Sequence, residues 1–345
     1  MKDLDAPHLP LLNTVDVQPI FLLGLARSGT TLLYKLLSQP QAFAYFQAYH
    51  IVKYDEILHN HVNKIEPEAR AALDAQYQAS GVNDRGFDRV SVASNFPAEY
   101  RVVLQNKGKL PHWTLRDCLQ LLQGKGIYDL FFEALKVSPE CTPLLLEACK
   151  KVQCISASQQ PLLLKNPWDS TNFIYLQSIF PQAKFIYILR DPLDILNSQL
   201  KALHTIFTTP SQYLRIQSKI YQKLAGNRIS FAGLRFLLLS PRTRKFRLGI
   251  LLHNIIATAN YIQTHLAALA QDQILFLTYE QLCRQPDATL ERIMNFLQVV
   301  PQKKVDYAAL IAPRSLQRLP ELVEHEEEIR EKLQPYEQLM NSLEC

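Results

Sequence analysis

Residues 19–39, PIFLLGLARSGTTLLYKLLSQ, form the most informative stretch of the sequence. A short apolar run ends at Gly24, and a pattern with apolar residues on one helical face begins after Gly29. A glycine-rich loop between a strand and a helix is typical of anion sites, because loop N–H groups and the helix N-terminus attract negative charge. The two glycines have Walker A spacing, but Thr30 and Thr31 stand where a nucleotide triphosphatase has Lys-Ser or Lys-Thr. The loop therefore predicts an anion site without the lysine that reaches a terminal phosphate.

Further apolar runs without alternation follow at residues 161–165, 184–190 and 273–279. Such runs are expected of strands buried on both faces of a parallel sheet, and helical patterns separate them. With the strand at 19–24 they predict a three-layer α/β fold of the P-loop type, with a central parallel sheet. In such folds ligands bind outside the carboxyl ends of the strands, and the distinctive polar motifs of this chain lie there.

The spread of these motifs favours a single domain over residues 1–345, with helical excursions at about 45–155 and 200–250. Six cysteines without C-x-x-C spacing indicate reduced thiols in a cytoplasmic protein. The first residues lack the apolar run of a signal peptide, and no segment approaches the roughly 18 apolar residues of a membrane span. We therefore expect a cytoplasmic protein.

The net charge is only +5, but its distribution is uneven. No Asp or Glu lies between Asp194 and Asp272, whereas residues 201–247 carry ten Lys and Arg. This stretch is compatible with a lid, with a surface that contacts anionic membrane lipid, or with ordinary helical packing that leaves a cationic face. It lacks a recognisable nucleic-acid-binding module, so we expect no nucleic-acid partner.

Two groups of residues have the chemistry of anion sites. In the first loop, backbone N–H groups would form a concave anion site, and three hydroxyls and one guanidinium add donors. These cofactor-binding candidates are Arg27, Ser28, Gly29, Thr30 and Thr31. The second group is in LRDPLDILNS, where Arg190 ends a strand and Ser198 falls on the second turn of the next helix. Two anion sites at adjacent strand ends suggest a nucleotide phosphorylated at two positions.

These motifs together resemble those of the sulfotransferases that use 3′-phosphoadenosine 5′-phosphosulfate (PAPS). GLARSGTT is similar to the family's 5′-phosphosulfate loop, and the eight-residue spacing of Arg190 and Ser198 matches its 3′-phosphate motif. LLLKNPW resembles its K-x-P element, and TYEQLCRQPDATLERIMNFL resembles its late segment, apart from Gln285 in place of an acid. The resemblance implies PAPS as co-substrate with no metal required, and transfer of a sulfuryl group to an acceptor hydroxyl.

Catalytic roles follow from the resemblance and from the chemistry. The K-x-P likeness implies that Lys165 stabilises the leaving oxygen, and Arg27 could neutralise charge on the sulfuryl group. The acceptor must also lose a proton to a general base, for which Glu99 and His50 rank equally and His204 third. The alternatives are a P-loop kinase or NTPase, in which Asp191 would bind Mg²⁺, and an inactive nucleotide-binding relative. The identity of the acceptor and the oligomeric state stay open.

Overall fold

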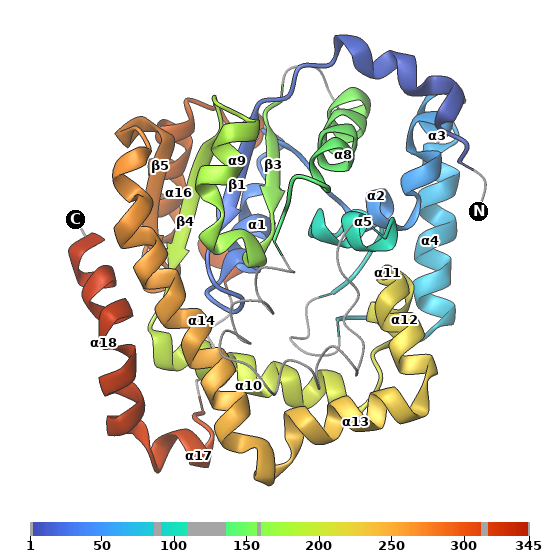
Figure 1. The fold of residues 1–345 in the computed structure, drawn as a ribbon. Coiled ribbons are helices and arrows are strands. Elements are labelled where there is room, and N and C mark those ends of the chain that lie inside the picture. Colours follow the sequence, from blue (N-terminus) through green and yellow to red (C-terminus); the bar gives the residue numbers. More distant parts are fainter. Residues whose placement is uncertain (1–2, 86–90, 109–135, 157–159, 312–316, 344–345) are drawn as a thin grey trace.

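The structure is a computed structural model that describes residues 3–85, 91–108, 136–156, 160–311 and 317–343. Within these residues, the core is a parallel sheet with the strand order β2-β3-β1-β4-β5 (Figure 1). Its strands are β1 (Pro19–Leu23), β2 (Ala44–Tyr45), β3 (Leu162–Lys165), β4 (Lys184–Leu189) and β5 (Ile274–Thr278). Four of them lie where the sequence predicts strands, with boundaries that differ by one residue at most.

Helices cover both faces of the sheet and make three layers (Figure 1). Side chains of β1 alternate between the two faces: Ile20 and Leu22 pack into one core, and Phe21 and Leu23 into the other. The first core is closed by α1 (Thr30–Leu37), α15 (Tyr279–Arg284) and α16 (Pro286–Leu297). The second is closed by α8 (Thr142–Ile155), α9 (Phe173–Ile179) and α14 (Arg244–His265). The predicted fold class is therefore confirmed.

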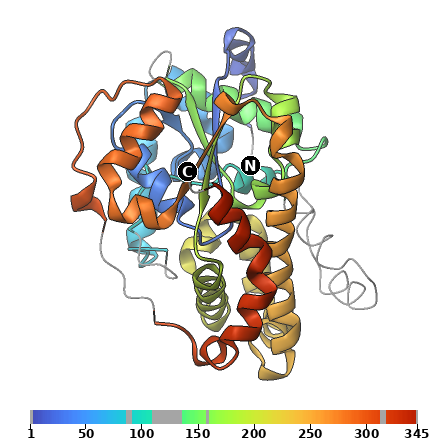
Figure 2. The same cartoon turned by 90° about the vertical axis from the view of Figure 1, so that its left-hand side faces the viewer.

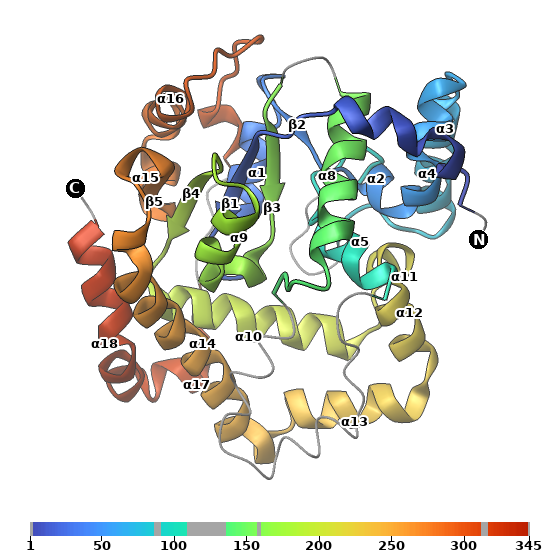
Figure 3. The same cartoon turned by 45° about the horizontal axis from the view of Figure 1, so that its top comes forward.

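Two groups of helices lie beyond these layers. The earlier group comprises α2 (Ala48–Val52), α3 (Ile57–Val62), α4 (Glu66–Ala79) and α5 (Arg101–Asn106). The later group comprises α10 (Pro192–Thr208), α11 (Gln212–Gln217), α12 (Lys219–Gly226) and α13 (Arg228–Leu239). Figure 3 shows α10 lying across the carboxyl ends of the strands, with α13 farther from the sheet. This places the start of α10 beside the predicted ligand-binding edge.

The last part of the chain returns to this edge. It forms α17 (Pro320–Val323) and α18 (Glu326–Leu343), and α18 packs along α14 and against α10 (Figure 2). The short 3-10 helices are η1 (Ala6–Thr14), η2 (Tyr54–Glu56), η3 (Pro167–Thr171), η4 (Pro241–Thr243), η5 (Leu266–Ala268), η6 (Gln271–Gln273) and η7 (Ala308–Leu310). Within the described segments, every helix is too short or too polar to cross a bilayer.

The N-terminal segment is held by a buried ion cluster. Asp5 and Lys151 are both 0% exposed, and the Lys151 Nζ lies 3.0 Å from an Asp5 carboxylate oxygen. The same Nζ is 3.1 Å from a carboxylate oxygen of Glu147 and donates to the carbonyl of Tyr54. Because the other Asp5 oxygen accepts from the N–H of His59, this cluster joins η1, α3 and α8.

One detail differs from the prediction made from the sequence. The strand β2 lies where helix was expected from about residue 45, because a strand of two residues has too little sequence to show a period. Part of the helical excursion predicted at about 45–155 lies outside the described residues. The single-domain assignment stays a prediction.

Candidate active site

The loop between β1 and α1 packs tightly against its neighbours. Gly24 and Gly29 have φ angles of 139° and 105°, a region that favours glycine. A Cβ on Gly24 would lie 2.5 Å from the carbonyl oxygen of Ile188, and one on Gly29 would lie 2.4 Å from the Tyr279 ring. Arg27 also has a positive φ of 78°, although it carries a side chain. The loop conformation is therefore specified by contacts with β4 and with the start of α15.

The hydroxyls of this loop point to a bound group. Ser28 is fully buried, yet its Oγ makes no hydrogen bond with any residue that the structure describes. Buried hydroxyls are normally paired, so an unpaired one inside an anion loop is expected to meet a ligand. Thr30 is 3% exposed, and the Thr31 Oγ1 accepts from the Lys165 Nζ at 2.8 Å.

The second predicted anion motif adjoins the first loop. Arg190 is 7% exposed, donates from Nη1 to the carbonyl of Arg27 at 3.0 Å, and lies over the Tyr279 ring at 4.2 Å. Its Nε is buried and has no hydrogen-bond partner among the described parts of the chain. Ser198 lies on the second turn of α10 and accepts from the Arg27 Nε at 3.0 Å. The two groups therefore form one continuous site that shares Arg27.

A lysine and a glutamate meet beside the loop. Lys165, at the end of β3, is 2% exposed, and its Nζ also donates to a Glu99 carboxylate oxygen at 2.8 Å. Burial lowers the pKa of Lys165, and the charge of Glu99 opposes that shift. Burial raises the pKa of Glu99, but the charge and hydrogen bond of Lys165, with the charges of Arg85 and Arg101, outweigh it and lower the pKa. The Lys165 Nζ and the Glu99 carboxylate oxygen are thus within ion-pair distance.

A buried carboxylate holds Glu99 in this place. Asp169 is 0% exposed and accepts from the Tyr100 hydroxyl at 2.5 Å and from the Asn166 side-chain amide at 2.6 Å. Since Tyr100 follows Glu99, and Asn166 follows Lys165, Asp169 ties the two partners of the ion pair together. The sequence reading missed this role, because only the fold brings these segments together.

Arg101 also lies near this centre. Its guanidinium lies 5.4 Å from the Trp168 ring, and its buried Nε makes no hydrogen bond within the described segments. Burial lowers its pKa to about 10, while the charges of Glu99 and Asp169 act in the opposite direction. Arg101 was not among the predicted site residues, because a single arginine at a helix start carries no distinctive sequence signal.

The two histidine candidates lie in other surroundings. His50 is 2% exposed, and its Nδ1 accepts from the backbone N–H of Gln47 at 3.2 Å, which caps α2. Burial, with the charge of Arg70, lowers the pKa of His50 to about 3. His204 is exposed, with its Nδ1 3.4 Å from the Thr208 hydroxyl. Among the contacts described above, none joins either histidine to Lys165, so their roles as bases stay predictions.

Comparison with known proteins agrees with this geometry. A profile described as the sulfotransferase family matches residues 19–301. The chain belongs to the sulfotransferase family. This finding does not favour the kinase or NTPase alternative. The matched span contains the loop, the lysine strand and the Arg190 motif, and it ends before α17 and α18.

Individual sulfotransferases are similar to this chain. A curated relative, omega-hydroxy-beta-dihydromenaquinone-9 sulfotransferase Stf3, is known from Mycobacterium bovis and Mycobacterium tuberculosis. It is 27% identical over 204 residues, which are 54% of this chain and 46% of the relative, so the match spans about half of that protein's length. Solved sulfotransferases STF9 of Mycobacterium avium and STF1 of Mycobacterium tuberculosis superpose with TM-scores of 0.53 and 0.52. STF9 is 13% identical, and its match covers 89% of this chain and 69% of STF9. STF1 is 16% identical, and its match covers 95% of this chain and 80% of STF1. At these identities the superpositions establish the fold alone.

Proposed function

We propose that this sulfotransferase moves a sulfuryl group from PAPS to an acceptor hydroxyl by in-line displacement. The observation that carries the proposal is the position of Lys165, whose Nζ bridges Thr31 of the anion loop and Glu99. A cation, an anion cradle and a carboxylate are the three groups that such a transfer needs. Charge stabilisation and positioning supply most of the catalysis in related phosphoryl transfer.

Each group has a proposed role. Residues 27–31 hold the 5′-phosphosulfate, with Arg27 neutralising charge on the sulfuryl group, and Arg190 with Ser198 holds the 3′-phosphate. The bond between sulfur and the bridging oxygen breaks as the acceptor oxygen bonds to sulfur. Lys165 stabilises the negative charge that develops on the bridging oxygen, and Glu99 accepts the acceptor's proton.

The base needs a change in its hydrogen bonding before it acts. A carboxylate whose pKa is lowered by a lysine is a weak base. We propose that Lys165 turns its hydrogen bond toward the donor when the donor binds, which raises the proton affinity of Glu99. Glu99 is preferred to His50 as the base because it touches Lys165, whereas the His50 Nδ1 is used in capping a helix.

The proposed acceptor is a hydroxyl on an amphiphilic molecule, reached from the cytoplasmic side of an anionic membrane. None of the residues of α13 is buried, and Ile229 and Phe236 are 81% and 57% exposed. These apolar side chains lie among Arg228 and Arg235, as in helices that bind membrane interfaces. The name of the curated relative, which refers to a hydroxylated menaquinone, supports the same acceptor class.

The membrane contact is tested by sedimentation with vesicles. We expect binding to phosphatidylglycerol-containing vesicles at low salt, weaker binding to pure phosphatidylcholine, and loss of binding in Arg228→Glu/Arg235→Glu. Unchanged binding in the double variant would contradict the contact. Arg292→Glu, an exposed position on α16, is the matched control.

The donor is tested by thermal shift, since a ligand that binds only the folded state raises Tm by mass action. We expect adenosine 3′,5′-bisphosphate to stabilise the protein more than ADP, which lacks the 3′-phosphate. Arg190→Ala should remove this difference, and the surface variant Arg292→Ala should keep it. Stabilisation by ATP with Mg²⁺ alone would contradict the proposed donor.

A further inference from the structure

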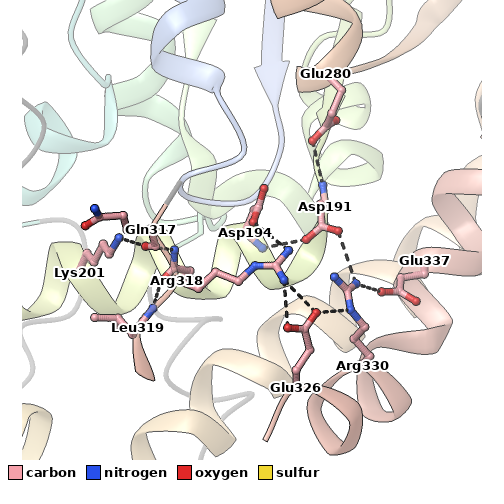
Figure 4. A network of polar contacts seen from close by, with 11 residues as sticks. Asp191, Asp194, Lys201, Glu280, Gln317, Arg318, Leu319, Glu326, Arg330 and Glu337 are labelled. Carbon is pink, nitrogen blue, oxygen red and sulfur yellow. Dashed lines mark hydrogen bonds and ion pairs between the residues drawn. The ribbon is translucent and has the colours of Figure 1, made fainter. Parts of the chain in front are cut away.

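The C-terminal segment 317–343 contacts the helix that carries the proposed 3′-phosphate site, although it lies outside the matched span 19–301. Figure 4 shows side chains of this segment directed toward the first turns of α10. The contacts form two groups, one at the start of α10 and one about a turn and a half farther along. Together they are called here the C-terminal clamp.

The first group of contacts joins α18 to the residue that follows Arg190. The Arg330 Nη1 lies 3.5 Å from an Asp191 carboxylate oxygen, and its Nε donates to Glu326 at 3.0 Å (Figure 4). Glu326 also accepts from Arg318 at 2.8 Å, and Arg318 lies 3.7 Å from Asp194. The two guanidiniums thus connect the two acids at the N-terminus of α10 with Glu326 of α18.

Asp191 connects this network with the nucleotide site. Its carboxylate caps α10 by accepting from the N–H of Asp194 at 2.9 Å. Its own N–H donates to Glu280 at 3.3 Å, and Glu280 adjoins the Tyr279 ring that lies under Arg190. A displacement of Asp191 would therefore also displace the backbone of Arg190.

The second group of contacts lies next to Ser198. Asn197 is 0% exposed, and its side-chain amide donates to the carbonyl of Gln317 at 3.1 Å. Its side-chain oxygen accepts from the N–H of Leu319 at 3.0 Å. Lys201 donates to the same Gln317 carbonyl. The segment is thus bound to α10 at Asn197 and at Lys201, which lie before and after Ser198 in the helix.

We propose that the C-terminal clamp positions the 3′-phosphate site, with Arg330 and Asn197 as positioning residues. The clamp holds Arg190 and Ser198 at the separation that a 3′-phosphate requires, and so contributes to the preference for a 3′-phosphorylated nucleotide. The inference rests on the proposed function, because it assigns the 3′-phosphate to these two side chains. Neither positioning residue touches the nucleotide.

The test compares two probes by isothermal titration calorimetry: adenosine 3′,5′-bisphosphate and 5′-AMP, which lacks the 3′-phosphate. Arg330→Gln should weaken binding of the bisphosphate about fivefold, and Asn197→Ala about tenfold, since exposed ion pairs contribute less than buried hydrogen bonds. Binding of 5′-AMP should change by less than about twofold in both variants. Lys332→Gln, which removes an exposed ion pair with Glu328 on the same helix, should leave both affinities unchanged.

The outcomes separate the two proposals. If the wild-type protein fails to prefer the bisphosphate to 5′-AMP, the proposed function itself is contradicted. If it has this preference and both variants retain it, the clamp has no positioning role and the inference is overturned. An equal loss for both probes also overturns it, because a merely structural role predicts that result. If Asn197→Ala does not fold, Arg330→Gln decides, because its side chain is 34% exposed.

Discussion

Replacing Lys151 by methionine should destabilise the protein strongly. Lys151 and Asp5 are fully buried, and the substitution leaves the Asp5 carboxylate with a backbone N–H as its remaining partner. Removing one partner of a buried ion pair costs about 3–5 kcal/mol, because the other charge stays away from water. With a urea dependence of about 3 kcal/mol/M, the unfolding midpoint should fall by about 1–1.7 M.

The assay is urea unfolding followed by circular dichroism. Lys150→Met is the matched control, since Lys150 is partly exposed, and it should change the free energy of unfolding by less than about 0.5 kcal/mol. The double variant Asp5→Asn/Lys151→Met should lose less free energy of unfolding than the two single variants together, because it contains no uncompensated buried charge. A Lys151→Met midpoint within about 0.3 M of wild type would refute the reasoning.

Three further changes have defined outcomes. The Gly29→Ala variant should no longer be stabilised by adenosine 3′,5′-bisphosphate, because the added Cβ would lie 2.4 Å from the Tyr279 ring. Gly81→Ala, also at a positive φ of 67° but with no atom of a described residue within 4 Å of the added Cβ, should keep this thermal shift. The pKa of Glu99 in the folded protein is lower than its ordinary value of 4.5. The ionised carboxylate therefore adds to the free energy of unfolding above pH 4.5, and this contribution is lost as the pH falls through the folded-state pKa. Glu99→Gln should therefore flatten the acid side of the urea midpoint against pH, and an unaltered profile would argue against an ionised Glu99. Tyr100→Phe should lower the free energy of unfolding by about 1–3 kcal/mol, because Asp169 loses the 2.5 Å hydrogen bond from the Tyr100 hydroxyl. Tyr45→Phe, on the edge strand β2, is the comparison variant.

Four of the five strands of the described sheet could be predicted from the sequence because they are largely buried on both faces. Runs such as LLLK and KFIYIL carry that burial in their composition, and prolines or polar motifs set their ends. The strand order was not predictable from these runs, since pairing of β1 with β3 and β4 depends on contacts between distant segments. The edge strand β2 has two residues and leaves no pattern.

The donor side of the candidate site was predictable for a different reason. Loops that bind phosphate need glycines, hydroxyls and arginines at fixed spacing, so Arg27, Ser28 and Arg190 could be named in advance. Glu99 could be named only as one candidate among several, because its importance depends on a contact with Lys165 across 66 positions. Asp169 accepts hydrogen bonds from backbone and side-chain groups of several segments, and no local pattern indicates such a role.

The place of β1 at the centre of the sheet has a consequence for synthesis of the chain. Its five residues are all buried, but both partner strands lie far downstream, the nearer beginning at Leu162. At roughly 5–20 residues per second, a ribosome needs about 7–28 s to add the roughly 140 residues between them. During that time the nascent strand PIFLL has no sheet to join. We therefore expect holding chaperones to bind this segment during translation, and refolding from urea to be slow.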